Sequence, residues 1–401
     1  SRAPKRSVLV TDRAARWVIT LGGIGSILAV SLVGLFLFYV VVPLFLPPEV
    51  DRAAEFAVGE VPAQPVHTAV NEYLTMSWTV HRDGSLFVRR LSDGRILARL
   101  EIPDAAQLTC WSFSIEDDRC AFGYADGSVR LGRIGFDTEF LPEDEVPAAL
   151  RDLAVGASEP LGPGMVERTP EEQFRRQELV LDLADPVALA DVPIVLVDQS
   201  VTTRGPVFAA LDARGVLHVS ELRERTNLLT GETTITTTGG ELDLRAEGLL
   251  SDAGIQPAHL LLTGLGDNVM LAWTGGRLLR IQSSDPESLA LAGETDLVPE
   301  KGHRLTALTF QIGKSSLVSG DDLGRVRVWF RVNDPESGRA RGSQLVLAHD
   351  LAAGGSPVVR IVPSARLRMV AAGFADGAAA LYHITSDQRL LQLTVGEVRG
   401  T

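Results

Sequence analysis

LTCWSFSIEDDRCAFGYADGSVRLGRI, residues Leu108–Ile134, is the stretch that decides the fold. It contains an alternating segment, a polar turn, a segment of small apolar residues, a turn with Asp126-Gly127 and a second alternating segment. Alternation with a period of two is typical of β-strands, and Asp-Gly supplies the left-handed backbone that tight hairpins require. The stretch therefore predicts three antiparallel strands joined by short turns.

The same cassette recurs along the chain. Clear copies are LTALTFQIGKSSLVSGDDLGRVRVW (Leu305–Trp329) and VVRIVPSARLRMVAAGFADGAAALYHI (Val358–Ile384), and weaker copies occur at Thr75–Leu91, Val207–Leu222 and Leu260–Ile281. The turn glycines are mostly about 45–60 residues apart, near the period of propeller blades. Stacked antiparallel sheets need neighbours on both faces, so the sequence predicts an all-β propeller of about six to seven blades. The turn glycines are Gly84, Gly127, Gly215, Gly276, Gly324 and Gly377.

Two segments depart from the cassette. A longer interval between the second and third turn glycines predicts an insertion at about 137–191, rich in Glu, Pro and Arg. Within it we expect a short helix at Glu143–Leu153 and a helix or an extended arm at Thr169–Leu181. The polar stretch Thr226–Gly240 is expected to form a long hairpin between the outer strands of one blade.

An apolar segment precedes these cassettes. Val18–Pro48 contains no charged residue, and about 20 apolar residues in a helix cross a bilayer core of roughly 30 Å. Pro43, Pro47 and Pro48 cannot continue a helix, because proline lacks the backbone donor. The segment is too long for the apolar region of a cleaved signal peptide, so we expect a retained anchor.

The charges that flank this segment predict its orientation. Five basic residues and Asp12 precede it, whereas Glu49, Asp51 and Glu55 follow it against Arg52. The basic end of a membrane helix stays in the cytoplasm. We therefore expect a cytoplasmic tail at 1–16, a transmembrane helix at 17–46, a linker at 47–70 and a periplasmic propeller at 71–401. The bilayer would be a bacterial inner membrane.

The charge balance limits the classes of partner. The chain carries a net charge of −13 and its first 48 residues carry +4, which leaves −17 for the rest. A surface this acidic repels nucleic acid and free phosphate. We expect no nucleic-acid partner.

The two cysteines, Cys110 and Cys120, are too far apart to pair in the predicted hairpin. A turn at about residues 116–118 places Cys120 opposite Phe113 or Ser114. Cys110 then lies several residues further along, beyond the reach of a disulfide at 3.3 Å per residue. We expect two buried free thiols.

Residue patterns that would carry chemistry are weak. Gly313-Lys314-Ser315 is similar to the end of a phosphate-binding P-loop, but Leu308 stands where the loop needs glycine, so Lys314 is interpreted as a turn residue. The acidic run Pro142–Glu145 is interpreted as a solvated helix start. The sequence contains no Gly-x-Ser-x-Gly elbow.

The seven histidines have no metal-ligand spacing, and His303 and His383 are expected to make structural hydrogen bonds. We assign no catalytic, cofactor-binding or metal-binding residue, no cofactor and no enzymatic activity. A propeller can nevertheless assemble a central-channel site from several blades.

The cassettes resemble the WD40 repeat, which implies a WD40-like propeller. The resemblance is partial: Trp329 precedes Phe330 where the family has Asp, and the Gly-His pair of the family occurs once, at Gly302-His303. Most of the buried polar tetrad that joins the blades of that family is missing.

The order of basic tail, membrane helix and propeller resembles the N-terminal part of the long-form permease subunit of the phosphate ABC importer, the PstC type. The phrases GFDTEFLPEDEVPAALR (Gly135–Arg151), VERTPEEQFRRQ (Val166–Gln177) and YVVVPLF (Tyr39–Phe45) carry this resemblance. It implies that the propeller is inserted between the first membrane helix and the remaining permease helices, which this sequence does not contain. The implied partners are the lipid bilayer and the permease, ATPase and phosphate-binding subunits of an importer.

Three functions remain open on the sequence. The first is an accessory or docking role of a membrane-anchored extracytoplasmic propeller in phosphate import, the chain being a fragment that continues into permease helices. The second is a stand-alone membrane-tethered propeller that serves as a scaffold for envelope proteins. The third is a propeller hydrolase or lectin, which requires polar residues that converge on the channel.

Overall fold

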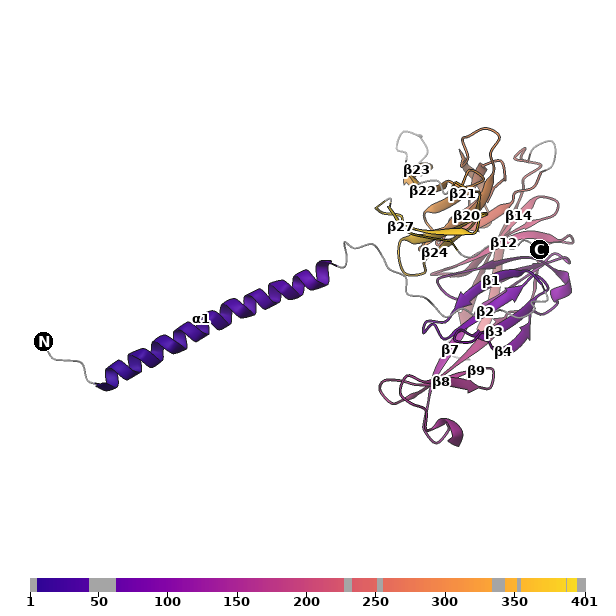
Figure 1. Ribbon diagram of the computed structural model, residues 1–401. Coiled ribbons are helices and arrows are strands. Elements are labelled where there is room, and N and C mark those ends of the chain that lie inside the picture. Colours follow the sequence, from indigo (N-terminus) through magenta and orange to yellow (C-terminus); the bar gives the residue numbers. More distant parts are fainter. Residues whose placement is uncertain are drawn as a thin grey trace. The chain divides into compact units, whose positions relative to one another are not determined.

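The computed structural model describes residues 6–42, 63–226, 233–250, 255–333, 343–351, 355–386 and 388–394. The chain divides into two compact units, Ser1–Ala53 and Ala54–Thr401. Among the described residues, the first contains the one long helix and the second contains every strand (Figure 1). Each unit is described separately.

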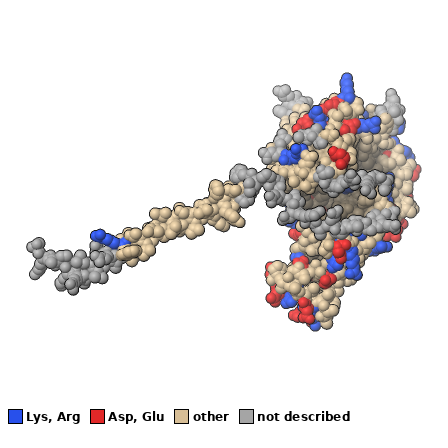
Figure 2. All heavy atoms as spheres, in the orientation of Figure 1, with Lys and Arg blue, Asp and Glu red and all other residues tan. Residues whose placement is uncertain are grey.

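The helix α1 spans Arg6–Val41 and contains one candidate membrane span, Ala15–Val41, with a mean hydropathy of 2.5. At 1.5 Å per residue, its 27 residues extend for about 40 Å, enough for a bilayer core. Over most of its described length it carries no charged side chain (Figure 2). A helix of this length and composition fits a membrane anchor or a signal sequence.

The observed start of α1 differs from the predicted boundary between tail and helix. Residues 6–16 are helical, although they belong to the predicted tail at 1–16. This segment contains neither proline nor glycine, so nothing in it interrupts helical hydrogen bonding. The predicted end of the transmembrane helix at residue 46 lies outside the described residues.

The second unit is an all-β propeller. Five of its sheets are four-stranded and antiparallel, with their strands in chain order. The first begins inside the predicted linker at 47–70, and most of that linker lies outside the described residues. The first sheet contains β1 (Pro65–Val70), β2 (Met76–His81), β3 (Ser85–Arg90) and β4 (Ile96–Glu101). The third contains β12 (Ile194–Thr202), β13 (Gly205–Asp212), β14 (Val216–Thr226) and β15 (Thr233–Asp243).

The remaining regular sheets follow the same pattern. The fourth sheet contains β16 (His259–Leu262), β17 (Asn268–Ala272), β18 (Arg277–Gln282) and β19 (Ala290–Asp296). The fifth contains β20 (Leu305–Phe310), β21 (Leu317–Asp321), β22 (Val326–Asn333) and β23 (Ser343–Leu351). The sixth contains β24 (Val358–Pro363), β25 (Met369–Phe374), β26 (Ala378–His383) and β27 (Gln388–Thr394).

The second sheet is enlarged to seven strands. Its members are β5 (Leu108–Phe113), β6 (Arg119–Tyr124), β7 (Ser128–Leu141), β8 (Ser158–Leu161), β9 (Gly164–Arg168), β10 (Phe174–Leu183) and β11 (Val187–Ala188). The described chain thus has five regular four-stranded blades and one enlarged sheet. The regular blades are fewer than the six to seven predicted, because the insertion changes the sheet that the best-formed cassette builds.

The first strands of the sheets lie at the centre of the propeller. Strands β5, β12, β16, β20 and β24 contact one another in that order, as the innermost strands of a propeller do. Arg360 on β24 then donates from Nη1 to the carbonyl oxygen of Val66 on β1, at 3.1 Å. This contact joins the last sheet to the first.

The turns between second and third strands contain the six predicted turn glycines. All six have positive φ, between 80° and 93°. At Gly127 a Cβ atom would lie 2.1 Å from the carbonyl oxygen of Ala190, which leads into the next sheet. Glycine is therefore required there for its backbone conformation and for the close approach of the following segment.

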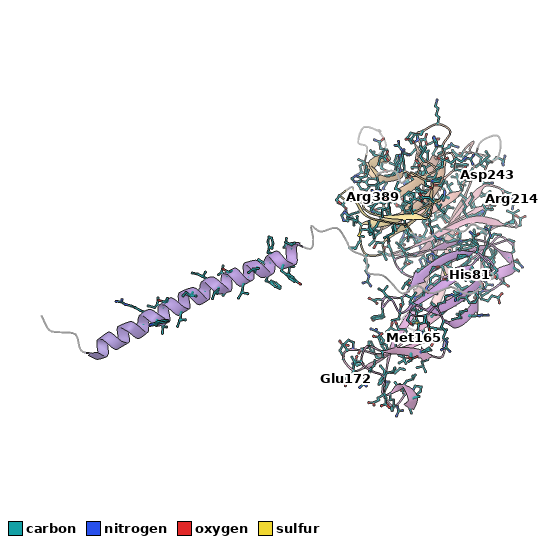
Figure 3. All side chains as sticks on the ribbon, in the orientation of Figure 1. His81, Met165, Glu172, Arg214, Asp243 and Arg389 are labelled. Carbon is teal, nitrogen blue, oxygen red and sulfur yellow. The ribbon has the colours of Figure 1, made fainter. Side chains whose placement is uncertain are left out.

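The insertion extends the second sheet into an antiparallel arm of β7, β10, β9 and β8 with a small core of its own. Strands β7 and β10 pair from Leu141↔Phe174 to Gly132↔Leu183, and β9 pairs with the outer part of β10. Val146, Val166 and Phe174 form the buried core of the arm. Figure 3 marks Met165 on β9 and Glu172 in the turn before β10.

Three expectations about secondary structure outside the repeated cassettes have different outcomes. The helix predicted at Glu143–Leu153 was wrong: these residues form turns and the short 3-10 helix η3 (Ala148–Leu150), because Pro147 interrupts a helix. Of the alternatives for Thr169–Leu181, the extended arm is observed, as β10. The hairpin expected at Thr226–Gly240 is formed by β14 and β15, and its tip at 227–232 lies outside the described residues.

The cysteine prediction is confirmed. Cys120 pairs with Phe113 across the β5–β6 hairpin, and Cys110 lies opposite Gly123. Both thiols are free and buried. Burial raises the pKa of each thiol to about 12, because the low-dielectric interior disfavours the thiolate.

Candidate binding site at the end of the central channel

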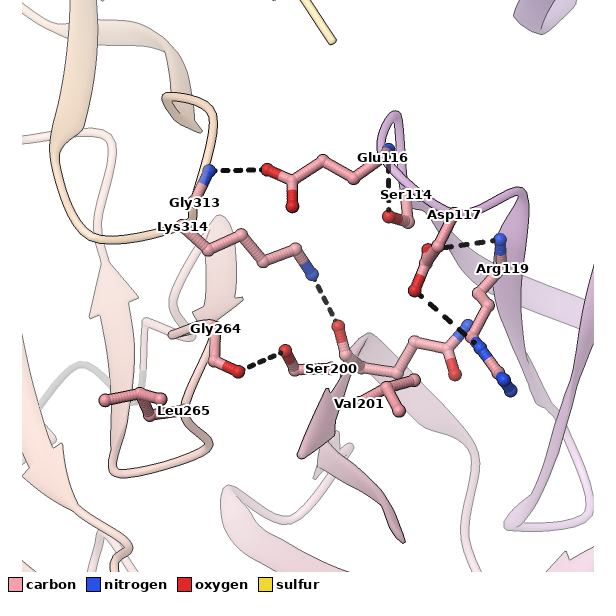
Figure 4. A pocket seen from close by; sticks show the side chains of 11 residues that line it. Ser114, Glu116, Asp117, Arg119, Ser200, Val201, Gly264, Leu265, Gly313 and Lys314 are labelled. Carbon is pink, nitrogen blue, oxygen red and sulfur yellow. Dashed lines mark hydrogen bonds and ion pairs between the residues drawn. The ribbon is translucent and has the colours of Figure 1, made fainter. Parts of the chain in front are cut away.

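The turns between first and second strands meet at one end of the channel, here called the turn end. Glu116 in the β5–β6 turn accepts a hydrogen bond at Oε1 from the Gly313 backbone N–H, 2.6 Å away in the β20–β21 turn (Figure 4). The β16–β17 turn joins them, because the Gly264 N–H donates to the Lys314 carbonyl oxygen at 3.2 Å. Segments nearly 200 residues apart are therefore linked.

Other contacts extend this arrangement to the remaining sheets. Ser200, near the end of β12, donates from Oγ to the Gly264 carbonyl oxygen at 3.1 Å (Figure 4). Arg366 in the β24–β25 turn forms an ion pair with Glu72 in the β1–β2 turn, with 2.9 Å between Arg366 Nη2 and Glu72 Oε1. The turn end is thus built by residues from every sheet of the propeller.

A pocket of about 270 Å³ opens among these turns. Sheets 2, 3, 4 and 5 contribute its walls, so it is a product of the ring and not of one blade. Figure 4 shows its polar side chains directed toward one another, with Val201 and Leu265 at its edge. Its lining includes Ser114, Glu116, Arg119, Gln199, Leu265 and Lys314.

Asp198, which precedes the lining residue Gln199 on β12, supports this pocket. The residue is 5% exposed, and its Oδ1 accepts hydrogen bonds from Ser112 Oγ at 2.6 Å and from the Gln199 N–H at 2.8 Å. Its Oδ2 accepts from the Leu262 N–H at 2.7 Å. A buried carboxylate is costly unless its oxygens are satisfied, and these donors come from β5, β12 and β16. Asp198 therefore fixes three innermost strands relative to one another.

Lys314 connects the fifth sheet to this carboxylate. Its Nζ donates to the Gln199 carbonyl oxygen at 2.6 Å and lies 3.9 Å from Asp198 Oδ1. The residue has φ +43°, in the left-handed region. Its interpretation as a turn residue is confirmed, since it lies between β20 and β21. The sequence did not reveal that the side chain reaches the third sheet.

One polar group in the pocket has no partner within the described part of the chain. Gln199 is 2% exposed, and its Nε2 makes no hydrogen bond there. Nearby, Arg119 and Asp117 form a solvent-exposed ion pair, with 3.7 Å between Arg119 Nε and Asp117 Oδ2. A buried donor without a partner costs about 1–3 kcal/mol, so an acceptor group brought by an occupant would be stabilised here.

The lining indicates recognition of a polar group. It offers amide, hydroxyl and ammonium donors together with the Glu116 and Asp117 carboxylates, framed by apolar Leu265 and Val201. In the described ranges, no three His, Cys, Asp or Glu side chains are grouped as metal ligands.

The other residues considered from sequence lie elsewhere. His303 shares a hydrogen bond with Asp322 Oδ1 at 3.1 Å, and His383 shares one with Ser386 Oγ at 2.8 Å, as expected. The acidic run 142–145 forms an exposed turn on the arm, not the start of a helix. None of these groups faces the pocket.

His67 has the most perturbed environment among the histidines for which a pKa shift is resolved. Its ring stacks on Phe113, with ring centroids 4.4 Å apart. Burial and, to a smaller extent, the charge of Arg360 lower its pKa from 6.5 to about 4. It is therefore neutral at pH 7 and packs as an aromatic ring between the first and second sheets.

The comparisons with known proteins give likenesses in structure but none in sequence. No protein-family model matches the chain, and no curated protein matches it in sequence. The β-propeller domain of Cps50 (Swd1) from Myceliophteria thermophila is similar in structure, with 13% identity over 84% of this chain and 89% of that chain, at a TM-score of 0.49. Saccharomyces cerevisiae Sqt1 is similar with 10% identity over 83% of this chain and 74% of that chain, at a TM-score of 0.44. The computationally designed protein Ika8 is similar with 16% identity over 85% of this chain and 90% of that chain, at a TM-score of 0.46. The six antiparallel sheets and the ordered contacts of their first strands show a β-propeller fold.

Proposed function

We propose that this chain is a membrane-anchored propeller that docks a partner protein at its turn end and performs no catalysis itself. The observation that carries this proposal is the presence of a polar pocket and of exposed apolar residues at the same end of the channel. Leu74, Leu265 and Leu367 are 74%, 73% and 58% exposed, and each lies in a turn between the first and second strands of its sheet. Large exposed apolar side chains at one end of a molecule are typical of protein-interaction sites, and Leu265 is the one that lines the pocket.

The pocket adds specificity to this surface. An apolar rim contributes affinity by burial, whereas convergent polar groups select a partner that satisfies them. The unpartnered Gln199 Nε2 favours a partner that presents a carbonyl or carboxylate oxygen. Lys314 and Asp198 hold the pocket in shape before binding, which reduces the entropy cost of association.

The partner that we propose belongs to a phosphate-type ABC importer. The resemblance of the helix exit and the insertion to the long-form PstC-type permease supports this assignment. In this proposal α1 is retained as an inner-membrane anchor with a cytoplasmic N-terminus, and the propeller lies in the periplasm as an accessory domain. Its net charge argues against capture of free phosphate by the propeller as a whole.

The test is co-purification of the full chain from membranes in a mild detergent. We expect the permease, ATPase and phosphate-binding subunits of one importer to co-purify with the wild-type chain. Leu265→Asp places a charge on the apolar rim and should abolish this association. Thr274→Asp is the matched control, because Thr274 is exposed in the β17–β18 turn at the opposite end of the channel.

The outcomes separate the candidate functions. Retention of the importer subunits by Leu265→Asp would contradict docking at the turn end. Specific recovery of other envelope proteins, without importer subunits, would support the stand-alone scaffold instead.

A further inference from the structure

A second pocket, of about 510 Å³, lies between the fifth and sixth sheets. It is lined by the β20–β21 turn, by β22 and β23, and by two turns of the sixth sheet. Gly313 and Lys314 of the β20–β21 turn face the channel pocket, whereas Gln311, Ser315 and Ser316 line this one. Its volume falls in the range of about 300–1,000 Å³ that is usual for small-ligand sites.

The polar lining of this pocket consists of groups that donate hydrogen bonds. It contains two guanidinium groups, one carboxamide, three hydroxyls and one imidazole, and none of its described lining residues is Asp or Glu. This composition contrasts with the strongly acidic chain around it. The groups belong to Arg331, Arg368, Gln311, Ser315, Ser316, Thr385 and His349.

Gln311 is the buried member of this set. It is 6% exposed, and its Nε2 has no hydrogen-bond partner within the described ranges. Its backbone is satisfied, because its N–H donates to the Ser316 carbonyl oxygen at 2.8 Å and its own carbonyl oxygen accepts from the Lys314 N–H at 2.9 Å. A buried amide donor without a partner is costly, so an acceptor supplied by a ligand would be stabilised here.

The two arginines differ in how they are held. Arg331 donates from Nη1 to Asp267 Oδ2 at 2.8 Å, which orients its guanidinium group. The Arg368 side chain forms no ion pair with any residue that the structure describes, and it lies in the β24–β25 turn. A guanidinium group pairs with carboxylate or phosphate through two parallel hydrogen bonds, so Arg368 is available for an anion.

The remaining walls are apolar. Phe330 and Val332 on β22 are 37% and 47% exposed, and Ile312 and Ile384 complete the surface. The Phe330 ring meets the His349 ring edge-on, with centroids 6.0 Å apart. A ligand that covers these walls needs an apolar body beside its anionic group, because inorganic anions leave that surface in water.

We propose that this pocket binds a small organic anion whose carboxylate or phosphate group is joined to an apolar body. The anionic group contacts Arg368 and Gln311 Nε2, and the apolar body packs on Phe330 and Val332. A membrane lipid and a soluble metabolite both supply this chemistry. The proposal does not depend on docking at the turn end.

The test is calorimetric titration of phenyl phosphate into the full chain, held in phosphatidylcholine nanodiscs. We expect saturable binding that is about tenfold or more weaker in Arg368→Ala, because one charge-assisted pair is lost. Arg366→Ala is the matched control: Arg366 lies two residues away in the same turn but pairs with Glu72, outside the pocket. The Arg366→Ala variant should bind phenyl phosphate with the same affinity as the wild-type chain.

Gln311→Leu separates a ligand-binding role from a structural one. It should weaken phenyl phosphate binding several-fold without lowering the melting temperature of the ligand-free chain, since Gln311 Nε2 has no partner to lose. Inorganic phosphate and benzyl alcohol, which carry only one half of the ligand each, should bind more weakly than phenyl phosphate.

Competition identifies the source of the ligand. Displacement of phenyl phosphate by soluble dihexanoyl phosphatidylglycerol, but not by dihexanoyl phosphatidylcholine, assigns the site to a lipid headgroup. Phenyl phosphate binding without such displacement assigns it to a soluble anion. The absence of saturable binding to the wild-type chain, or equal affinity in Arg368→Ala, would overturn the proposal.

Discussion

At the scale of the residue, Asp198 shows how one buried charge organises the centre of the propeller. Its carboxylate accepts hydrogen bonds from Ser112 on β5, from its own strand and from Leu262 on β16. Lys314 of the fifth sheet supplies the nearest positive charge, 3.9 Å away. The same side chain therefore stabilises the ring and fixes the geometry of the candidate site.

Replacement of Asp198 by alanine should be strongly destabilising. The change leaves the Leu262 N–H without its acceptor and Lys314 without its counter-charge, so we expect a loss of about 3–5 kcal/mol in the free energy of unfolding. Urea denaturation followed by tryptophan fluorescence measures this loss. The control is Asp93→Ala, which removes an ion pair between Arg90 and the exposed Asp93 and should cost far less, because solvent screens such pairs. Equal losses in the two variants would refute the role of Asp198.

His67 predicts a dependence of stability on pH. Its folded-state pKa of about 4 lies below the usual 6.5, so the unfolded chain binds a proton more readily. The contribution of His67 is complete above about pH 6.5 and is lost as the pH falls toward 4, by about 2 kcal/mol at pH 5.

Urea denaturation at pH 7.5 and pH 5 measures this contribution. His67→Phe keeps an aromatic ring against Phe113 and should lose less stability at pH 5 than the wild-type chain. His383→Gln, at a histidine outside this interface, should behave as the wild-type chain does. An unchanged acid response in His67→Phe would show that His67 is not the group responsible.

At the scale of the element, the turns between second and third strands are the best-defined feature of the chain. Each begins a third strand, and in the first five sheets the turn glycine approaches the segment that leads into the next sheet. At Gly127 this approach is to a carbonyl oxygen, whereas Gly156 has nearly the same φ, +81° against +82°, with no atom within 4 Å of a built Cβ. The two positions separate the backbone requirement from the steric one.

Gly127→Ala and Gly156→Ala should therefore differ. Both place a Cβ in the left-handed region, which costs about 1 kcal/mol. Gly127→Ala also forces a Cβ against the Ala190 carbonyl oxygen and should cost about 2 kcal/mol more. Thermal unfolding of both variants gives the comparison. Equal shifts in melting temperature would mean that the Ala190 segment moves away without cost.

The strands were predictable from the sequence because their signals are local. Alternation and the Asp-Gly turns depend on residues a few positions apart, and every predicted turn glycine adopts positive φ. The insertion was less predictable, because Glu143–Leu153 has a helix-like composition but contains Pro147 and lies on a β-sheet extension. Tertiary pairing of β10 with β7 decided the outcome there.

At the scale of the whole molecule, the candidate site was not predictable from one sequence. Glu116, Gln199 and Lys314 belong to three separate sheets, and none of them stands out from its neighbours in the sequence. Only closure of the ring places them together. The sequence indicated that a channel site could be assembled from several blades, but it carried no signal for which turns would face one another.

The two proposed sites are neighbours in the assembled propeller. The channel pocket has mixed charges and an apolar rim, which favours a protein partner, whereas the pocket between the fifth and sixth sheets offers donors to an anion. They share the β20–β21 turn, residues 311–316. Occupation of one pocket therefore restrains a segment that lines the other.

Site-specific photocrosslinking in intact cells tests the central claim most directly. A photoreactive amino acid is placed at Leu265 on the turn end or at Thr274 on the opposite end, and adducts are identified by mass spectrometry. We predict that Leu265 yields an adduct with a permease or phosphate-binding subunit of an ABC importer and that Thr274 yields none. The absence of an adduct at Leu265, or the same adducts from both positions, would contradict the account.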